Sequence, residues 1–132
     1  MPTRSAVRLL VADDDPDTLA AYVLFFDAQG YQTCALADGA QASAEYSAWH
    51  PDAVALDVQM PGRDGRAVAR EIRYLQFRPA PLLAAVTALT SPVEKAKSLS
   101  AGFNHHFAKP ADLPVILAAI AARIGPGGTH RQ

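Results

Sequence analysis

Five short apolar runs recur along the chain, and polar or turn-forming residues follow each of them. The runs cover residues 7–12, 31–36, 53–56, 82–86 and 104–108. After each run, apolar side chains repeat at three- and four-residue spacing, the period of a helix that buries one face. This alternation predicts an α/β domain, in which helices cover both faces of a parallel sheet.

Capping residues mark where several of the helices begin. Asp15 precedes Pro16, a combination that favours an N-cap followed by the first helical residue. Ser91 and Glu94 have the spacing of a capping box, and Asp112 stands before the last helical segment. We therefore predict helices over residues 16–29, 40–49, 67–75, 92–101 and 113–124.

Length and composition indicate a single domain. The chain has 132 residues, of which 50% are hydrophobic and 19% charged, and this suits one core of ordinary size. We predict a domain over residues 1–125 and a flexible C-terminal tail over residues 126–132. Cys34 is the only cysteine, so no disulfide can form within the chain.

The charge balance narrows the classes of partner. The net charge is -1, from 12 basic and 13 acidic residues, so no excess of charge points to nucleic acid or an anionic membrane. No apolar run reaches the roughly 20 residues of a membrane-spanning helix, and the first residues lack a signal-peptide core. We therefore expect no nucleic-acid partner, no membrane segment and a cytoplasmic location.

Side chains that can do chemistry stand at the ends of four predicted strands. Asp13 and Asp14 follow the first run, Asp57 the third, Thr87 the fourth and Lys109 the fifth. The carboxyl ends of parallel strands lie at one edge of the sheet, where such sheets bind their ligands. We therefore expect these five side chains to lie close together.

Three carboxylates in one place suggest a cation. They repel one another, and their pKa values rise unless a positive charge lies among them. A hard cation such as Mg²⁺ prefers carboxylate, carbonyl and water oxygens, and Lys109 adds an ammonium group. With Thr87 as a hydroxyl donor and Asp57 as a nucleophile, the set would suit a phosphoryl group. The alternatives are structural: acids cap helices and loops, threonine favours strands, and a lysine before proline is usually solvated.

The same side chains lie in segments that resemble a known family, the receiver domains of two-component response regulators. The segments occur in the family's order and span nearly the whole domain: residues 9–16, 55–65, 86–88 and 107–110. The resemblance implies a flavodoxin-like (βα)5 fold, with a doubly wound, parallel, five-stranded sheet in the strand order 2-1-3-4-5. The residue pattern alone leaves the strand order open.

The resemblance also implies a magnesium site. Asp57 is similar to the residue that accepts the phosphoryl group in the family. Asp14 corresponds to a direct Mg²⁺ ligand, and Asp13 to a residue that acts mainly through metal-bound water. The backbone carbonyl of Gln59 would complete the ligands that the protein supplies. The cofactor that we expect is therefore Mg²⁺.

Three further roles follow from the resemblance. Thr87 and Lys109 would bind the phosphoryl oxygens, with the bond between Lys109 and Pro110 cis, and Thr87 would move inward when the phosphoryl group binds. The family's switch residue, usually Tyr or Phe, lies three positions before the lysine, where this chain has His106. We interpret His106 as a surface histidine without a special role, with a proton-sensitive switch as the alternative.

By the resemblance, the expected function is that of a signalling module and not an enzyme, beyond assisting its own phosphorylation and dephosphorylation. The phosphoryl donor would be a sensor histidine kinase or a histidine phosphotransfer domain, and phosphorylation could produce a homodimer. One alternative is a Mg²⁺-dependent phosphohydrolase that uses an aspartyl phosphate. Such enzymes carry an acid two residues after the nucleophile, where this chain has Gln59. The other alternative is an interaction module that works without phosphorylation.

Overall fold

The computed structural model describes residues 6–124, which form five parallel strands and five helices. The strands form one sheet in the order β2-β1-β3-β4-β5. Both the α/β class and the strand order implied by the resemblance are confirmed. The strands are β1 (Arg8–Ala12), β2 (Gln32–Leu36), β3 (Ala53–Leu56), β4 (Leu82–Thr87) and β5 (His105–Ala108).

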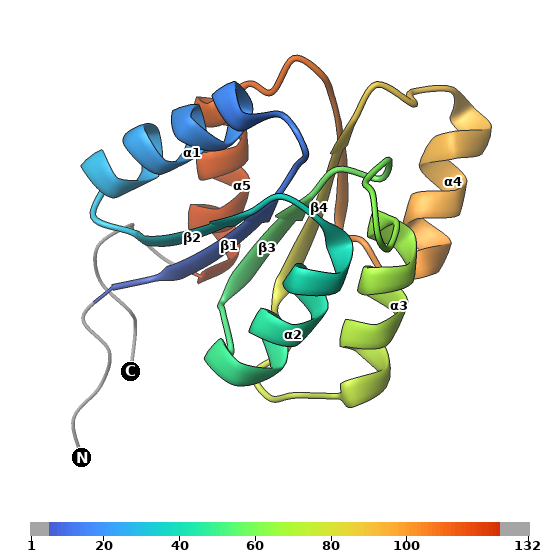
Figure 1. Ribbon diagram of the computed structural model, residues 1–132, viewed down its shortest axis with the longest axis horizontal. Helices are drawn as coiled ribbons and strands as arrows, with labels where there is room; N and C mark the ends of the chain where they lie inside the picture. The colour runs from blue at the N-terminus through green and yellow to red at the C-terminus, as the bar shows by residue number, and fades with distance from the viewer. Residues whose placement is uncertain (1–5, 125–132) are drawn as a thin grey trace.

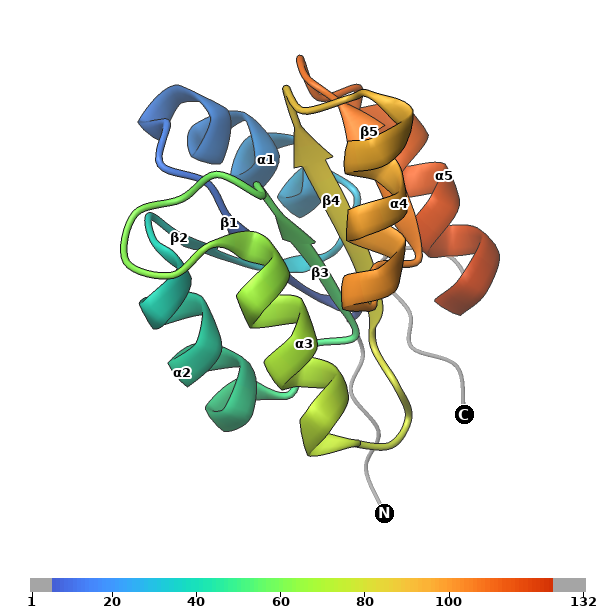
Figure 2. The same cartoon turned by 90° about the vertical axis from the view of Figure 1, so that its right-hand side faces the viewer.

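Helices cover both faces of the sheet, as Figures 1 and 2 show. Helices α1 and α5 lie on one face, whereas α2, α3 and α4 lie side by side on the other. The helices are α1 (Pro16–Ala28), α2 (Gly39–Trp49), α3 (Gly65–Leu75), α4 (Pro92–Ala101) and α5 (Leu113–Ile124). Within the described residues, no helix is both long and apolar enough to cross a membrane.

The sheet separates two apolar clusters, because alternate side chains of each strand point to opposite faces. Along β1, Leu10 packs with α2 and α3, whereas Leu9 and Val11 pack on the opposite face. Tyr22 and Phe26 of α1 belong to this second cluster, together with residues of α5. Both clusters are fully covered, so the interior strands are apolar on both sides.

Aspartate and serine caps fix where the helices begin. Asp15 accepts from Asp17 N, Ser91 from Glu94 N and Asp112 from Val115 N, as the sequence predicts. Two predicted starts are late, because α2 begins at Gly39 and α3 at Gly65. Asp38 and Asp64 are the N-caps of these helices, so the glycines expected in loops are the first helical residues. The predicted tail, residues 126–132, lies outside the described part of the chain.

Gly65 permits the close approach of α3 to the end of β3. Its backbone N–H donates to Val58 O at 2.9 Å, and a Cβ at this position would collide with the Asp57 carbonyl oxygen. We expect Gly65→Ala to lower the free energy of unfolding by about 1–3 kcal/mol, since backbone must move to make room. Urea denaturation measures this change, and a loss below about 0.5 kcal/mol would show that the loop yields freely.

Candidate functional site

Backbone hydrogen bonds hold the predicted site residues at one edge of the sheet. Asp13 N donates to Leu36 O at 3.1 Å, and Asp57 N donates to Ala12 O at 3.0 Å. Lys109 N donates to Thr87 O at 3.0 Å. Each of these bonds continues the strand ladder past its last residue. The strands therefore fix where the Asp13, Asp57 and Lys109 side chains begin.

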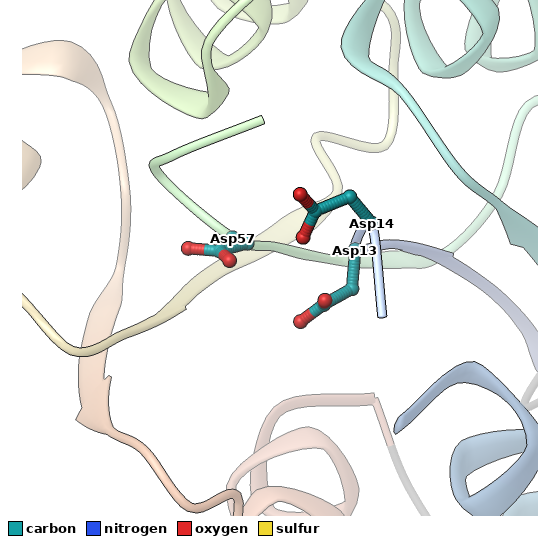
Figure 3. Close-up of side chains that lie close together, drawn as sticks. All are labelled: Asp13, Asp14 and Asp57. Carbon is teal, nitrogen blue, oxygen red and sulfur yellow. The ribbon is translucent and has the colours of Figure 1, made fainter. Parts of the chain in front are cut away.

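The three carboxylates lie together, as the sequence predicts. Asp13, Asp14 and Asp57 each offer an oxygen, and these three oxygens lie within 4.8 Å of one another. Figure 3 shows them converging from the loop after β1 and from the end of β3. Asp13 and Asp57 are 3% and 6% exposed, whereas Asp14 is open to solvent. Two acids of the cluster are therefore buried, and the third is accessible to solvent.

Lys109 joins two of these acids. Its Nζ donates to Asp57 Oδ2 at 2.8 Å and lies 2.9 Å from Asp13 Oδ2. Burial lowers the pKa of Lys109, but the hydrogen bonds and charges of Asp57 and Asp13 outweigh it and leave the pKa raised. The peptide bond between Lys109 and Pro110 is cis, as the resemblance implies. Lys109 is thus a charged group that bridges the ends of β1 and β3.

The remaining oxygens of the buried acids also have partners. Gln59 N donates to Asp57 Oδ1 at 3.1 Å, and Asp15 N donates to Asp13 Oδ1 at 2.9 Å. These bonds fix the two carboxylate planes before any ligand binds. Gln59 is therefore next to the site, as predicted, while the role of its carbonyl oxygen as a ligand stays a prediction.

An open cleft of about 650 Å³ adjoins the acids. Asp14 and Gln59 line it, and so do Met60, Arg66 and Arg70. Solvent therefore has a direct path to Asp14. The cleft lies between the loop after β3 and the start of α3, where ligands bind in folds of this kind.

Thr87 is the last residue of β4 and is fully buried. Its Oγ1 accepts a hydrogen bond from Leu89 N at 3.2 Å. A hydroxyl has one hydrogen to donate, and accepting from Leu89 leaves that hydrogen free for another partner. Thr87 therefore lies at the predicted edge with a donor still available.

The expectation that His106 is a surface residue is wrong, whereas a role for it as a switch stays a prediction. Its side chain is half-buried and both ring nitrogens have partners: Nδ1 is 2.9 Å from Ser98 Oγ, and Nε2 is 2.7 Å from Leu89 O. The partners come from α4 and from the loop after β4. A histidine with two partners on different elements is a structural link between them.

Sequence reasoning missed the partner group around Ser98. Ser98 is fully buried in α4, and Arg66 of α3 lies 3.4 Å from its Oγ. Arg66 Nη2 also donates to Glu94 O at 2.8 Å and to Glu94 Oε1 at 2.9 Å. The hydrogen bond from Arg66 holds the pKa of Glu94 below its usual value. A serine on the buried face of α4 is the one signal that could have indicated this group.

Comparison with known proteins identifies relatives. The family described as "Response regulator receiver domain" matches residues 9–121. The DNA-binding response regulator MtrA of Mycolicibacterium smegmatis is 32% identical over 117 residues. This match covers 89% of the chain and 50% of MtrA, so the chain spans about half the length of the curated relatives that it matches.

Solved structures with the same fold include two complexes. One holds the Saccharomyces cerevisiae histidine phosphotransfer signalling protein Ypd1 and the receiver domain of its downstream response regulator Ssk1. Its matching chain has a TM-score of 0.82 at 21% identity, with 91% of this chain and 90% of that chain covered. The other is the CheX–CheY–BeF3–Mg²⁺ complex of Borrelia burgdorferi, with a TM-score of 0.79 at 24% identity. That match covers 88% of this chain and 87% of the other.

Proposed function

The chain belongs to the response regulator receiver domains, and from that membership we propose that Asp57 is the residue that accepts a phosphoryl group. The observation that carries the proposal is the bridge made by Lys109 between Asp57 and Asp13, within a cluster of three acids. It supplies a nucleophilic oxygen and a cation for the incoming phosphoryl oxygens at one place.

The side chains divide the work of the transfer. An oxygen of Asp57 attacks the phosphorus of a phosphohistidine, the new P–O bond forms, and the P–N bond breaks with its electron pair on the imidazole, which takes a proton from water. Lys109 neutralises negative charge on the phosphoryl oxygens, and Thr87 donates its free hydrogen to one of them. Gln59 N and Lys109 Nζ donate hydrogen bonds to the two Asp57 oxygens, and these bonds orient the carboxylate for attack.

The acid cluster fits Mg²⁺, because its three oxygens are of the hard type and lie within 4.8 Å of one another. Asp14 and Asp57 would hold the ion, with the Gln59 carbonyl as a further ligand, and the ion would neutralise charge on the phosphoryl group. Both Asp13 oxygens already accept hydrogen bonds, from Asp15 N and Lys109 Nζ. Both Asp57 oxygens also accept hydrogen bonds, so the role of Asp13 through metal-bound water stays a prediction from the family.

The partner would be a sensor histidine kinase or a histidine phosphotransfer domain. The similarity to the Ypd1–Ssk1 complex supports such a partner, since Ssk1 is there with a phosphotransfer protein. A role as a signalling module without substrate turnover, a cytoplasmic location and a homodimer stay predictions. DNA binding is named for the full-length relative MtrA. The net charge of -1 gives no support for DNA binding by this chain.

The two alternative functions find little support in the site. A phosphohydrolase would need an acid or base where Gln59 stands, and an amide can do neither task. A module that works without phosphorylation would have no need of buried acids and a lysine gathered at one edge of the sheet. The phosphoacceptor function therefore accounts for more of the geometry than either alternative.

Thermal unfolding with Mg²⁺ and beryllofluoride tests the proposed function. Mg²⁺ at 100 times its Kd should stabilise the domain by about 2.7 kcal/mol, because it binds the folded site alone. For a domain of this size we expect a rise in Tm on the order of 10 °C. Beryllofluoride should add a further rise only when Mg²⁺ is present.

A matched pair of exposed acids controls this experiment. Asp14→Asn should remove the Mg²⁺ effect, whereas Asp17→Asn, in the first turn of α1 and outside the cluster, should keep it. If the parent melts at one temperature with and without both additions, the proposed metal and phosphoryl site is ruled out.

A further inference from the structure

The His106 ring connects two elements that border the site. Nε2 lies 2.7 Å from Leu89 O, in the loop between β4 and α4, and Nδ1 lies 2.9 Å from Ser98 Oγ in α4. The ring comes from β5, so one side chain joins the strand, the loop and the helix. Phenylalanine could make neither bond, and tyrosine has a single polar atom for both.

The partners determine which nitrogen carries the proton. A carbonyl oxygen accepts only, so Nε2 must be protonated to bind Leu89 O. Ser98 can then donate its hydroxyl hydrogen to Nδ1, and its oxygen can accept the long contact from Arg66 at 3.4 Å. A proton on Nε2 of His106 therefore satisfies Leu89 O, and Ser98 can serve both Nδ1 and Arg66.

Leu89 transmits the restraint to Thr87. Its carbonyl oxygen is held by His106, and its N–H donates to Thr87 Oγ1 at 3.2 Å. Both polar backbone groups of Leu89 thus have side-chain partners. Because Thr87 accepts from Leu89, its hydroxyl hydrogen has to point elsewhere, and this leaves it available to the phosphoryl site.

Helix α4, which contacts His106 Nδ1 through Ser98, is itself bound to α3. Arg66 of α3 ties to Glu94 of α4 by an ion pair of 2.9 Å, and their side chains are 12% and 26% exposed. The same guanidinium contacts Ser98, the partner of His106. The ring is thus held between a loop and a helix that is itself braced against its neighbour.

We propose that His106 is a positioning residue that holds the loop after β4, and through Leu89 the hydroxyl of Thr87, in the orientation that receives a phosphoryl oxygen. The inference rests on the proposed function of the site. It assigns this role to the two hydrogen bonds of the imidazole, which hold the ring before any phosphoryl group arrives. His106 would therefore act by fixing a donor in advance and not by rotating into space that Thr87 vacates.

Two amide variants separate the two ring nitrogens. The amide nitrogen of His106→Gln can take the place of Nε2 and donate to Leu89 O, whereas the shorter His106→Asn reaches only the place of Nδ1. With Mg²⁺ present, His106→Asn and His106→Phe should bind beryllofluoride about two- to tenfold more weakly than the parent, the range for one lost hydrogen bond. His106→Gln should stay within about twofold. Equal affinity in all four proteins would overturn the inference.

The affinity for Mg²⁺ separates a specific effect from a general loss of structure, because only a general loss would weaken Mg²⁺ binding. His106 contacts none of the three acids in the described structure, so the Kd for Mg²⁺ alone should be the same in the parent and all three variants. Weaker beryllofluoride binding with unchanged Mg²⁺ binding supports positioning of Thr87. A parallel loss of both affinities would mean that the variants damage the fold, and would overturn the specific role.

Side-chain ¹⁵N NMR of the unmodified parent needs no variant. The inference expects a proton on Nε2 of His106, and expects Ser98→Ala to leave that proton in place. An Nε2 without a proton, or rapid exchange of the proton between the two nitrogens, would overturn it. If the parent fails to bind beryllofluoride at all, the proposed function falls; if it binds and only the variant series shows no effect, this inference falls alone.

Discussion

Replacing Asp57 with asparagine should abolish covalent phosphorylation by acetyl phosphate. The amide is close in shape to the carboxylate, and its oxygen can still accept from Gln59 N, which now lies 3.1 Å from Asp57 Oδ1. It lacks the negative oxygen that attacks phosphorus, so the P–O bond cannot form. Intact-mass spectrometry after incubation with acetyl phosphate and Mg²⁺ should show the added phosphoryl group on the parent and none on the variant.

An exposed aspartate elsewhere provides the control. Asp112 caps α5 through Val115 N, and asparagine caps a helix equally well, so Asp112→Asn should be phosphorylated like the parent. Peptide mapping would then place the phosphoryl group on Asp57. A phosphorylated Asp57→Asn variant, or a phosphoryl group mapped to another aspartate of the parent, would refute the assignment.

Replacing Lys109 with methionine should both slow phosphorylation and destabilise the metal-free domain. Methionine keeps a long, unbranched side chain but leaves Asp13 and Asp57 without the cation that lies 2.9 and 2.8 Å from them. Breaking a buried ion pair on one side costs about 3–5 kcal/mol, and we expect about 3, because the Lys109 side chain is 27% exposed. Chemical denaturation without Mg²⁺ measures the change.

The double variant shows whether charge is the cause. Adding Asp57→Asn to Lys109→Met removes one of the unpaired acids, so the double variant should be more stable than Lys109→Met alone. Simple addition of the two single effects would mean that packing by the lysine chain, and not its charge, is what is lost.

The dependence of stability on pH provides a second check. The pKa of Lys109 is raised in the folded state, so its stabilising effect is complete below the ordinary lysine pKa and is lost as the pH rises through the folded value. The difference in stability between the parent and Lys109→Met should therefore shrink at strongly alkaline pH. A difference that grows with alkalinity would contradict the ion-pair explanation.

The sequence is most informative where chemistry coincides with strand ends. Asp13, Asp57, Thr87 and Lys109 each follow a short apolar run, and the parallel sheet gathers such positions by its geometry alone. No tertiary detail is needed for that step, because strand ends in a parallel sheet share an edge. The same local logic predicts the caps at Asp15 and Ser91, whose hydrogen bonds reach only two or three residues along the chain.

The contacts of His106 cannot be predicted from positions along the chain. Its partners are a carbonyl oxygen in a loop and a serine on a helix, 17 and 8 residues away, and no periodicity shows that they meet at one ring. The choice of Lys109 to pair with Asp13 and Asp57 also follows from side-chain packing in space. Position along the chain predicts the neighbourhood of a side chain, and the folded structure then determines its partners.

The sheet that divides the interior into two apolar clusters has an evolutionary consequence. Helices α1 and α5 pack against one set of buried residues and helices α2 to α4 against another, so a replacement in one set alters no side chain of the other. The two sides of the molecule are thus free to diverge separately. A lineage could remodel the outer surface on one flank to meet a new binding companion while the opposite flank keeps an inherited one.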